Sequence, residues 1–137
     1  MPTIVWSYLT VALGGAIGAM ARYTLSGVVL TSSGSIPLGT LVSNLLGCLF
    51  MGVIAQLAAG SPWFNDAGFF PDHYRLLFAV GFCGSFTTLS ALVFEMSEMM
   101  QRELVGMAFV YFAATMLGAF ACFYVGATVV RLLLQSQ

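Results

Sequence analysis

The residues of this chain that are suited to chemistry gather in one short segment, Gly81 to Ser90. It holds two glycines and four hydroxyl residues, and it lies in the middle of a long apolar run. Irregular backbone survives at membrane depth only where it is buried in protein or lines a wet cavity. We therefore predict a spanning helix that is broken near the bilayer centre, which is typical of an ion or substrate site. A glycine-rich packing face without such a site is the alternative.

The composition indicates an integral membrane protein. Of the 137 residues, 60% are hydrophobic and only 7% are charged, and the mean hydropathy is +0.98. A soluble domain carries about 25% charged residues. The length allows four spans with short loops and leaves no room for a second domain. The net charge of −1 argues against nucleic acid, or an anionic lipid surface, as the main partner.

The apolar runs predict an all-helical fold with four membrane spans in a single domain, residues 1–137. The expected spans are residues 4–30, 39–59, 75–100 and 104–134, and the third contains the break. Runs of this length cross about 30 Å of hydrocarbon. Small residues spaced by four, such as Gly14 and Gly18, predict close packing between helices.

The arginines predict no preferred orientation in the membrane. Both termini of a four-span chain face one side, which carries Arg75 and Arg131, whereas Arg22 and Arg102 belong to the other. Positive charge selects the cytoplasmic side, so this two-against-two count lets the chain insert both ways. Oppositely inserted copies can pair about a two-fold axis in the membrane plane. We therefore expect an antiparallel, dual-topology dimer with its axis near the break.

Polar residues in the other spans are further candidates for a site, because polar groups are costly in hydrocarbon. Thr40 and Asn44 share a face of the second span, as Tyr111 and Thr115 do in the fourth. Together with the hydroxyls of the break they supply hydrogen-bond donors without a lysine or a mid-membrane acid. Such a set suits a small anion that must shed its water and leave again. Interhelical hydrogen bonding is the alternative for each residue.

Two charged residues lie within the expected spans. Arg22 lies inside the first span, and Glu95 follows the break by two helical turns. Either side chain can extend to the membrane interface. The alternative places Arg22 in a vestibule that attracts anions and Glu95 near the mouth of a pore. We expect no enzyme, because Cys83 has no nearby base in the sequence and His73 stands alone in a loop.

Three motifs of the chain resemble, in order, those of the CrcB/Fluc fluoride channels. They are Gly14 to Tyr23, Pro37 to Gly47 and Gly81 to Ser90. The resemblance covers nearly the whole chain. It implies a dual-topology homodimer, multi-pass in the plasma membrane (the bacterial inner membrane), that exports toxic cytoplasmic fluoride passively through two pores.

The resemblance also implies roles for single residues. The fluoride pathway would include Asn44, Ser90, Tyr111 and Thr115, with Arg22 and Glu95 at the vestibule. Gly84 and Thr87 would bind a central structural Na⁺ through their backbone carbonyls. Carbonyl oxygens suit a hard cation, and a helix break frees them.

The chain departs from the family where two phenylalanines are usual. Members usually read Phe-Ser-Thr-Phe after the two threonines, and here the pathway positions are Leu89 and Leu92 in the run Leu-Ser-Ala-Leu. Phenylalanine presents a positive ring edge to an anion, which leucine lacks. Three explanations are open. The channel conducts with leucine at these positions, it pairs as a heterodimer with a homologue that supplies the phenylalanines, or it does not conduct.

Two further function classes are alternatives to a channel. A small dual-topology multidrug exporter needs a membrane-buried carboxylate to couple protons to a cationic drug, and the first span has none. A structural or assembly subunit would carry no ion of its own.

Overall fold

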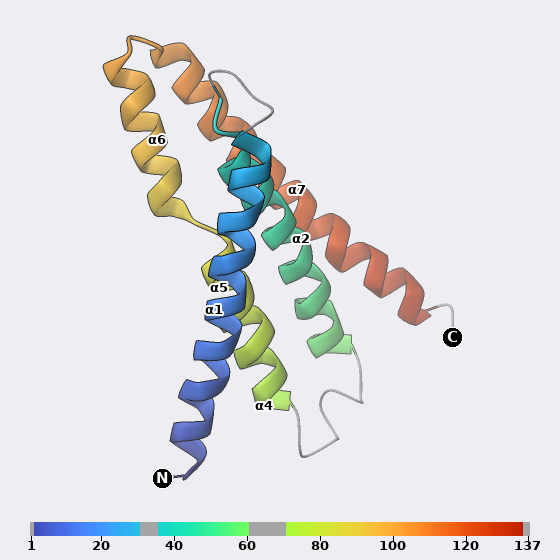
Figure 1. Ribbon diagram of the computed structural model, residues 1–137. Coiled ribbons are helices and arrows are strands. Elements are labelled where there is room, and N and C mark those ends of the chain that lie inside the picture. Colours follow the sequence, from blue (N-terminus) through green and yellow to red (C-terminus); the bar gives the residue numbers. More distant parts are fainter. Residues whose placement is uncertain (1, 31–35, 61–70, 136–137) are drawn as a thin grey trace.

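The computed structural model describes residues 2–30, 36–60 and 71–135, and all regular structure in these ranges is helical (Figure 1). The elements are α1 (Pro2–Leu30), α2 (Leu38–Gly60), α4 (Pro71–Tyr74), η1 (Arg75–Cys83), α5 (Gly84–Phe86), α6 (Leu89–Gln101) and α7 (Val105–Gln135). Four stretches are long and apolar enough to cross a membrane: Ile4–Val28, Leu38–Ala59, Arg75–Gln101 and Val105–Gln135. The prediction of an all-helical fold with four candidate spans is confirmed.

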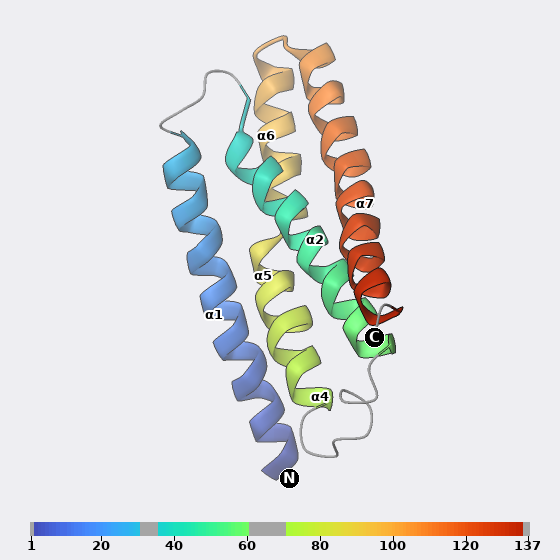
Figure 2. The ribbon, with the colours of Figure 1, turned by 90° about the vertical axis from the view of Figure 1, so that its right-hand side faces the viewer.

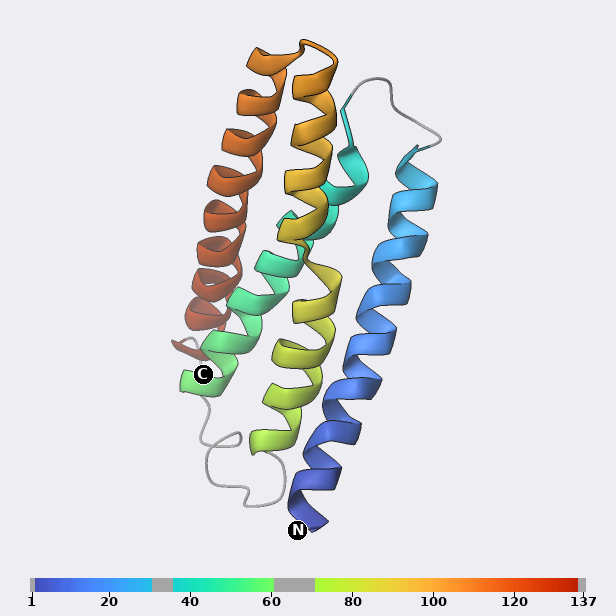
Figure 3. The same cartoon turned by 90° about the vertical axis from the view of Figure 1, so that its left-hand side faces the viewer.

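The four spans run alternately up and down the long axis of the molecule (Figures 1 and 2). α1 rises, α2 descends, the third span rises through η1, α5 and α6, and α7 descends, so α2 and α7 run in the same direction. α2 packs mainly against α7, and α1 packs mainly against η1. α1 begins and α7 ends at the same end of the molecule (Figures 2 and 3).

The third span is the least regular of the four. It begins as a π-helix, η1, in which hydrogen bonds reach five residues back, and the Gly84 N–H still donates to the Ala79 carbonyl. Helical conformation then stops after Phe86, where Thr87 (φ −82°, ψ 153°) and Thr88 (φ −152°, ψ 119°) are extended, and α6 begins at Leu89. Figure 3 shows this interruption as a thin link between two helices. The sequence interpretation did not predict the π-helix, since no residue pattern announces that hydrogen bonding.

Glycines set the close approach of α1 to η1. A Cβ atom on Gly14 would clash with the Leu77 carbonyl oxygen, and one on Gly18 would clash with the Phe82 carbonyl oxygen. The clashing atoms belong to the backbone, which cannot rotate aside as a flexible side chain can. The prediction that this glycine pair forms a packing face is confirmed.

Alanine substitutions in α1 should distinguish the glycines that contact η1 from a glycine that contacts no other element. Gly14→Ala and Gly18→Ala should each lower the free energy of unfolding by about 1–3 kcal/mol, the usual cost of overpacking. Gly27→Ala is the matched control, because a Cβ there meets nothing within 4 Å. The measurement is the melting temperature of each purified variant in detergent. Equal melting temperatures for Gly18→Ala and Gly27→Ala would contradict the close approach.

Candidate functional site

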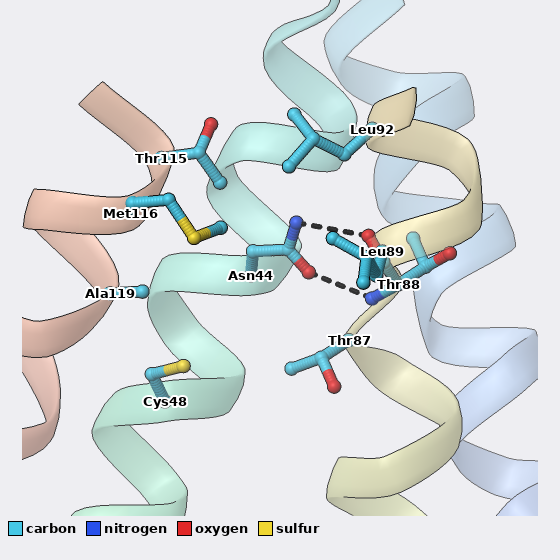
Figure 4. A pocket seen from close by; sticks show the side chains of 9 residues that line it. All are labelled: Asn44, Cys48, Thr87, Thr88, Leu89, Leu92, Thr115, Met116 and Ala119. Atoms are coloured by element: carbon cyan, nitrogen blue, oxygen red, sulfur yellow. Dashed lines mark hydrogen bonds between the residues drawn. The ribbon is translucent and has the colours of Figure 1, made fainter. Parts of the chain in front are cut away.

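A pocket of about 170 Å³ lies beside the interruption of the third span (Figure 4). Its lining comes from α2, from the interruption, from α6 and from α7: Asn44, Cys48, Thr87, Thr88, Leu89, Leu92, Thr115, Met116 and Ala119. The fold therefore brings five of the predicted site residues to one place: Asn44, Thr87, Leu89, Leu92 and Thr115.

Asn44 holds the interruption through both polar atoms of its side chain. Its Oδ1 accepts a hydrogen bond from the Thr88 N–H at 2.8 Å, and its Nδ2 donates to the Thr88 carbonyl at 3.2 Å (Figure 4). In a continuous helix that N–H would donate to the Gly84 carbonyl. Asn44 is 7% exposed, so its amide supplies the partners that water supplies to a surface loop.

The Thr88 side chain begins the next helix. Its Oγ1 accepts a hydrogen bond from the Ala91 N–H at 3.2 Å, which makes Thr88 the N-cap of α6. The same hydroxyl lies 3.1 Å from the Ser90 hydroxyl, which is exposed on the single chain. The backbone of Thr88 is thus hydrogen-bonded to Asn44, and its side chain caps α6.

The interruption changes which groups the nearby carbonyls can bind. The N–H groups that a continuous helix would direct at the carbonyls of Gly84 and Thr87 donate instead to Asn44 and to Thr88 Oγ1. The Ser85 carbonyl accepts a hydrogen bond from Arg22 Nε at 3.3 Å. Carbonyl oxygens relieved of their helical donors are the ligands that a hard cation prefers. The donor chemistry at Gly84 and Thr87 therefore fits the predicted Na⁺.

A second polar cluster surrounds the Glu95 carboxyl group. Thr40 Oγ1 donates to Oε1 at 2.6 Å, and the Tyr111 hydroxyl donates to Oε2 at 2.7 Å. Thr40 precedes Asn44 by one turn of α2, and Tyr111 precedes Thr115 by one turn of α7, so the cluster lies about 6 Å along the helices from the pocket. The cluster and the pocket lie in succession between α2, α6 and α7. We refer to the polar side chains along this line as the polar column: Thr40, Asn44, Glu95, Tyr111 and Thr115.

The two shared faces predicted from the sequence are the buried ones. Thr40, Asn44, Tyr111 and Thr115 are all less than 9% exposed, although polar side chains of this kind mostly lie at protein surfaces. Thr115 is 0% exposed, and its hydroxyl donates to the Tyr111 carbonyl within α7 at 2.8 Å.

The two leucines at the expected phenylalanine positions have different surroundings. Leu92 is 0% exposed and belongs to a core cluster with Met99, Ala108 and Tyr111. Leu89 is 64% exposed on the single chain, at the rim of the pocket. The pocket-lining residues Cys48 and Met116 were missed by the sequence interpretation. Cys48 follows Asn44 by one helical turn, and that spacing is the signal that would have found it.

Known proteins with similar sequences align with most of this chain's length. The profile of the family described as "CrcB-like protein, Camphor Resistance (CrcB)" matches residues 9–127. The "Fluoride-specific ion channel FluC" of Methylobacillus flagellatus is 36% identical over 133 residues, which cover 96% of this chain and 99% of that protein. "Fluoride-specific ion channel FluC 1" of Geobacillus kaustophilus is 42% identical over 109 residues, or 80% of this chain and 84% of that protein. This chain therefore belongs to the CrcB family, a family of ion channels rather than enzymes.

Proposed function

We propose that this protein is a fluoride-selective channel that exports toxic cytoplasmic fluoride by passive flow. The printed names of the relatives support the identity of the ion. The observation that carries the mechanism is the interruption at Thr87 and Thr88, held by Asn44 beside a pocket within an apolar span. In this proposal the interruption lies near the bilayer centre.

The polar column between α2, α6 and α7 is the proposed fluoride pathway. A strongly hydrated ion enters hydrocarbon only if donors replace its water, and the hydroxyls of Thr40, Tyr111 and Thr115 come from two helices along one line. Thr40 and Tyr111 already direct their protons at the Glu95 carboxylate. A passing fluoride would compete with Glu95 for these same donors, which keeps binding weak enough for release.

Asn44, Ser90 and Arg22 have separate roles in this proposal. Asn44 positions the interruption, because both of its polar atoms bind Thr88. Its Nδ2 carries a second N–H that this contact does not use. Ser90 lies at the exposed side of the interruption, where its hydroxyl contacts Thr88. Arg22, whose Nε binds the Ser85 carbonyl, places positive charge beside the same segment and would attract anions into a vestibule.

We propose that two copies pair with opposite orientations about an axis near the interruption. Gly84 and Leu89 are exposed on the single chain although they flank an interruption that hydrocarbon could not satisfy. A second copy would cover them. A central structural Na⁺ would bind the Gly84 and Thr87 carbonyls of both copies and supply a positive charge at the axis. The oxygens that each chain would contribute are those of the two carbonyls that accept no hydrogen bond from the N–H four residues on.

A second candidate function rests on the two leucines. Leu92 is enclosed in an apolar cluster and brings no aromatic edge to the pathway. A homologue that pairs with another chain carrying the phenylalanines, or one that does not conduct, would have this feature.

Fluoride efflux from liposomes tests the proposed function directly. Liposomes that contain the purified protein and are loaded with potassium fluoride should release fluoride far faster than empty liposomes when valinomycin allows potassium to leave. Liposomes loaded with potassium chloride should release chloride at the rate of empty ones. Fluoride efflux no faster than that of empty liposomes would contradict a conducting homodimer and favour the second candidate.

Removal of the Asn44 amide should destabilise the interruption. Asn44→Leu keeps the side chain branched at Cγ and leaves the N–H and C=O of Thr88 without partners, at a cost of about 1–3 kcal/mol for each group. Ser43→Ala is the matched control, because Ser43 is equally buried and its hydroxyl donates within α2 to the Thr40 carbonyl. Melting temperature and fluoride efflux should both fall in Asn44→Leu and change little in Ser43→Ala. A melting temperature of Asn44→Leu equal to that of the control would refute the positioning role.

The two leucines should respond differently to phenylalanine. Leu89→Phe adds a ring at the rim of the pocket, a position that the single chain leaves open and the proposed second copy would face, so it should raise the fluoride efflux rate. Leu92→Phe overpacks a closed cluster and should cost about 1–3 kcal/mol of stability. Efflux rates and melting temperatures of both variants check this pair of outcomes. An unchanged efflux rate in Leu89→Phe would show that other donors carry the ion.

A further inference from the structure

A second pocket, of about 300 Å³, lies between α2 and α7 near the ends of both helices. Its polar lining consists of Gln56, Thr128 and Arg131, and its aromatic lining consists of Phe123 and Tyr124. None of these residues belongs to the proposed fluoride pathway. Tyr124, Thr128 and Arg131 are spaced by four and three residues, so they share one face of α7.

Two glycines explain why a hollow forms at this level. A Cβ on Gly52 of α2 would clash with the Phe123 carbonyl oxygen, and one on Gly126 of α7 would clash with the Leu49 carbonyl oxygen. The two backbones therefore touch at the glycines. About one turn further on, both helices carry larger residues, Gln56 and Arg131, and these line the pocket.

The position along the helices places the pocket at the boundary between hydrocarbon and headgroups. α2 has 23 residues, or about 35 Å at 1.5 Å per residue, which is slightly more than about 30 Å of hydrocarbon. Gln56 and Arg131 each lie one turn before the last residue of their helix, Gly60 and Gln135. An arginine side chain at that depth extends to the phosphate level, and tyrosine is enriched in the same zone.

The charge of Arg131 is open to a ligand. Arg131 is exposed, and the acidic side chains that the structure describes, those of Glu95, Glu98 and Glu103, form no ion pair with it. A guanidinium group binds phosphate oxygens through two parallel hydrogen bonds. The Gln56 amide and the Thr128 hydroxyl add neutral donors to the lining of the same pocket. This combination of one cation, two neutral donors and an aromatic wall matches a phosphate that carries glycerol and acyl chains.

We propose that this pocket binds the phosphate of an anionic phospholipid, with Arg131 as its charged ligand. Basic pockets between spanning helices bind such headgroups in other membrane proteins. The chain's net charge of −1 does not oppose this assignment, because recognition depends on the local charge at the pocket. The proposal is independent of conduction, and a protein that passes no fluoride would still bind the lipid.

The test compares soluble short-chain lipids on the purified protein in detergent. Dihexanoyl phosphatidylglycerol should raise the melting temperature at about tenfold lower concentration than dihexanoyl phosphatidylcholine. Both lipids carry the phosphate, but only phosphatidylcholine also carries a cationic choline, which the Arg131 charge repels. Arg131→Gln should abolish this preference. Arg102→Gln is the matched control, because Arg102 is an exposed arginine beyond the other end of α7, and it should keep the preference.

A third variant and a third ligand separate the pocket from a bare surface charge. Ala55→Trp fills the hollow from an exposed position and leaves Arg131 in place, so it should weaken the preference as Arg131→Gln does. A preference that survives in Ala55→Trp or in Arg131→Gln would overturn the proposal. Inorganic phosphate should stabilise far less than phosphatidylglycerol, and equal stabilisation would overturn the assignment to a lipid.

Discussion

The structure depends on one constraint, which is that hydrocarbon offers no partner to an unpaired backbone group. The third span stops being helical at Thr87 and Thr88, so its peptide groups need partners from side chains. Asn44 provides two of them and Thr88 Oγ1 a third. The carbonyls of Gly84 and Thr87 do not receive the hydrogen bonds that a continuous helix would give them. Their lone pairs are therefore available to another ligand.

α2 is the element that lets this constraint be met. It carries Asn44 opposite the interruption and Thr40 opposite Glu95, one turn apart. Its glycines allow close contact on both sides, since a Cβ on Gly47 would clash with Thr87 Cγ2 and one on Gly52 with the backbone of α7. The polar column and the lipid-facing pocket are therefore both consequences of how α2 packs. A helix held so closely at several levels keeps its polar side chains in place.

Much of the architecture follows from pattern alone, because apolar runs of about 20 residues report spans directly. The small-residue spacing of Gly14 and Gly18 likewise reports close packing, and the i,i+4 pairs of Thr40 with Asn44 and Tyr111 with Thr115 report the buried faces. The π-helix of η1 was not predicted, because no residue pattern in Arg75–Cys83 indicates hydrogen bonds that reach five residues back. The bidentate contact of Asn44 with Thr88 was not predictable either, since it joins residues 44 positions apart. The unequal burial of Leu89 and Leu92 depends on the direction in which α6 leaves the interruption.

The Asn44 amide satisfies the Thr88 peptide group and so maintains the interruption. Hydrogen exchange of the Thr88 amide, followed by NMR in the purified protein, tests it most directly. We expect slow exchange in the native chain and fast exchange in Asn44→Leu, while amides in the body of α2 stay slow in both. Slow exchange at Thr88 in both proteins would contradict the account, because another group would then hold that N–H.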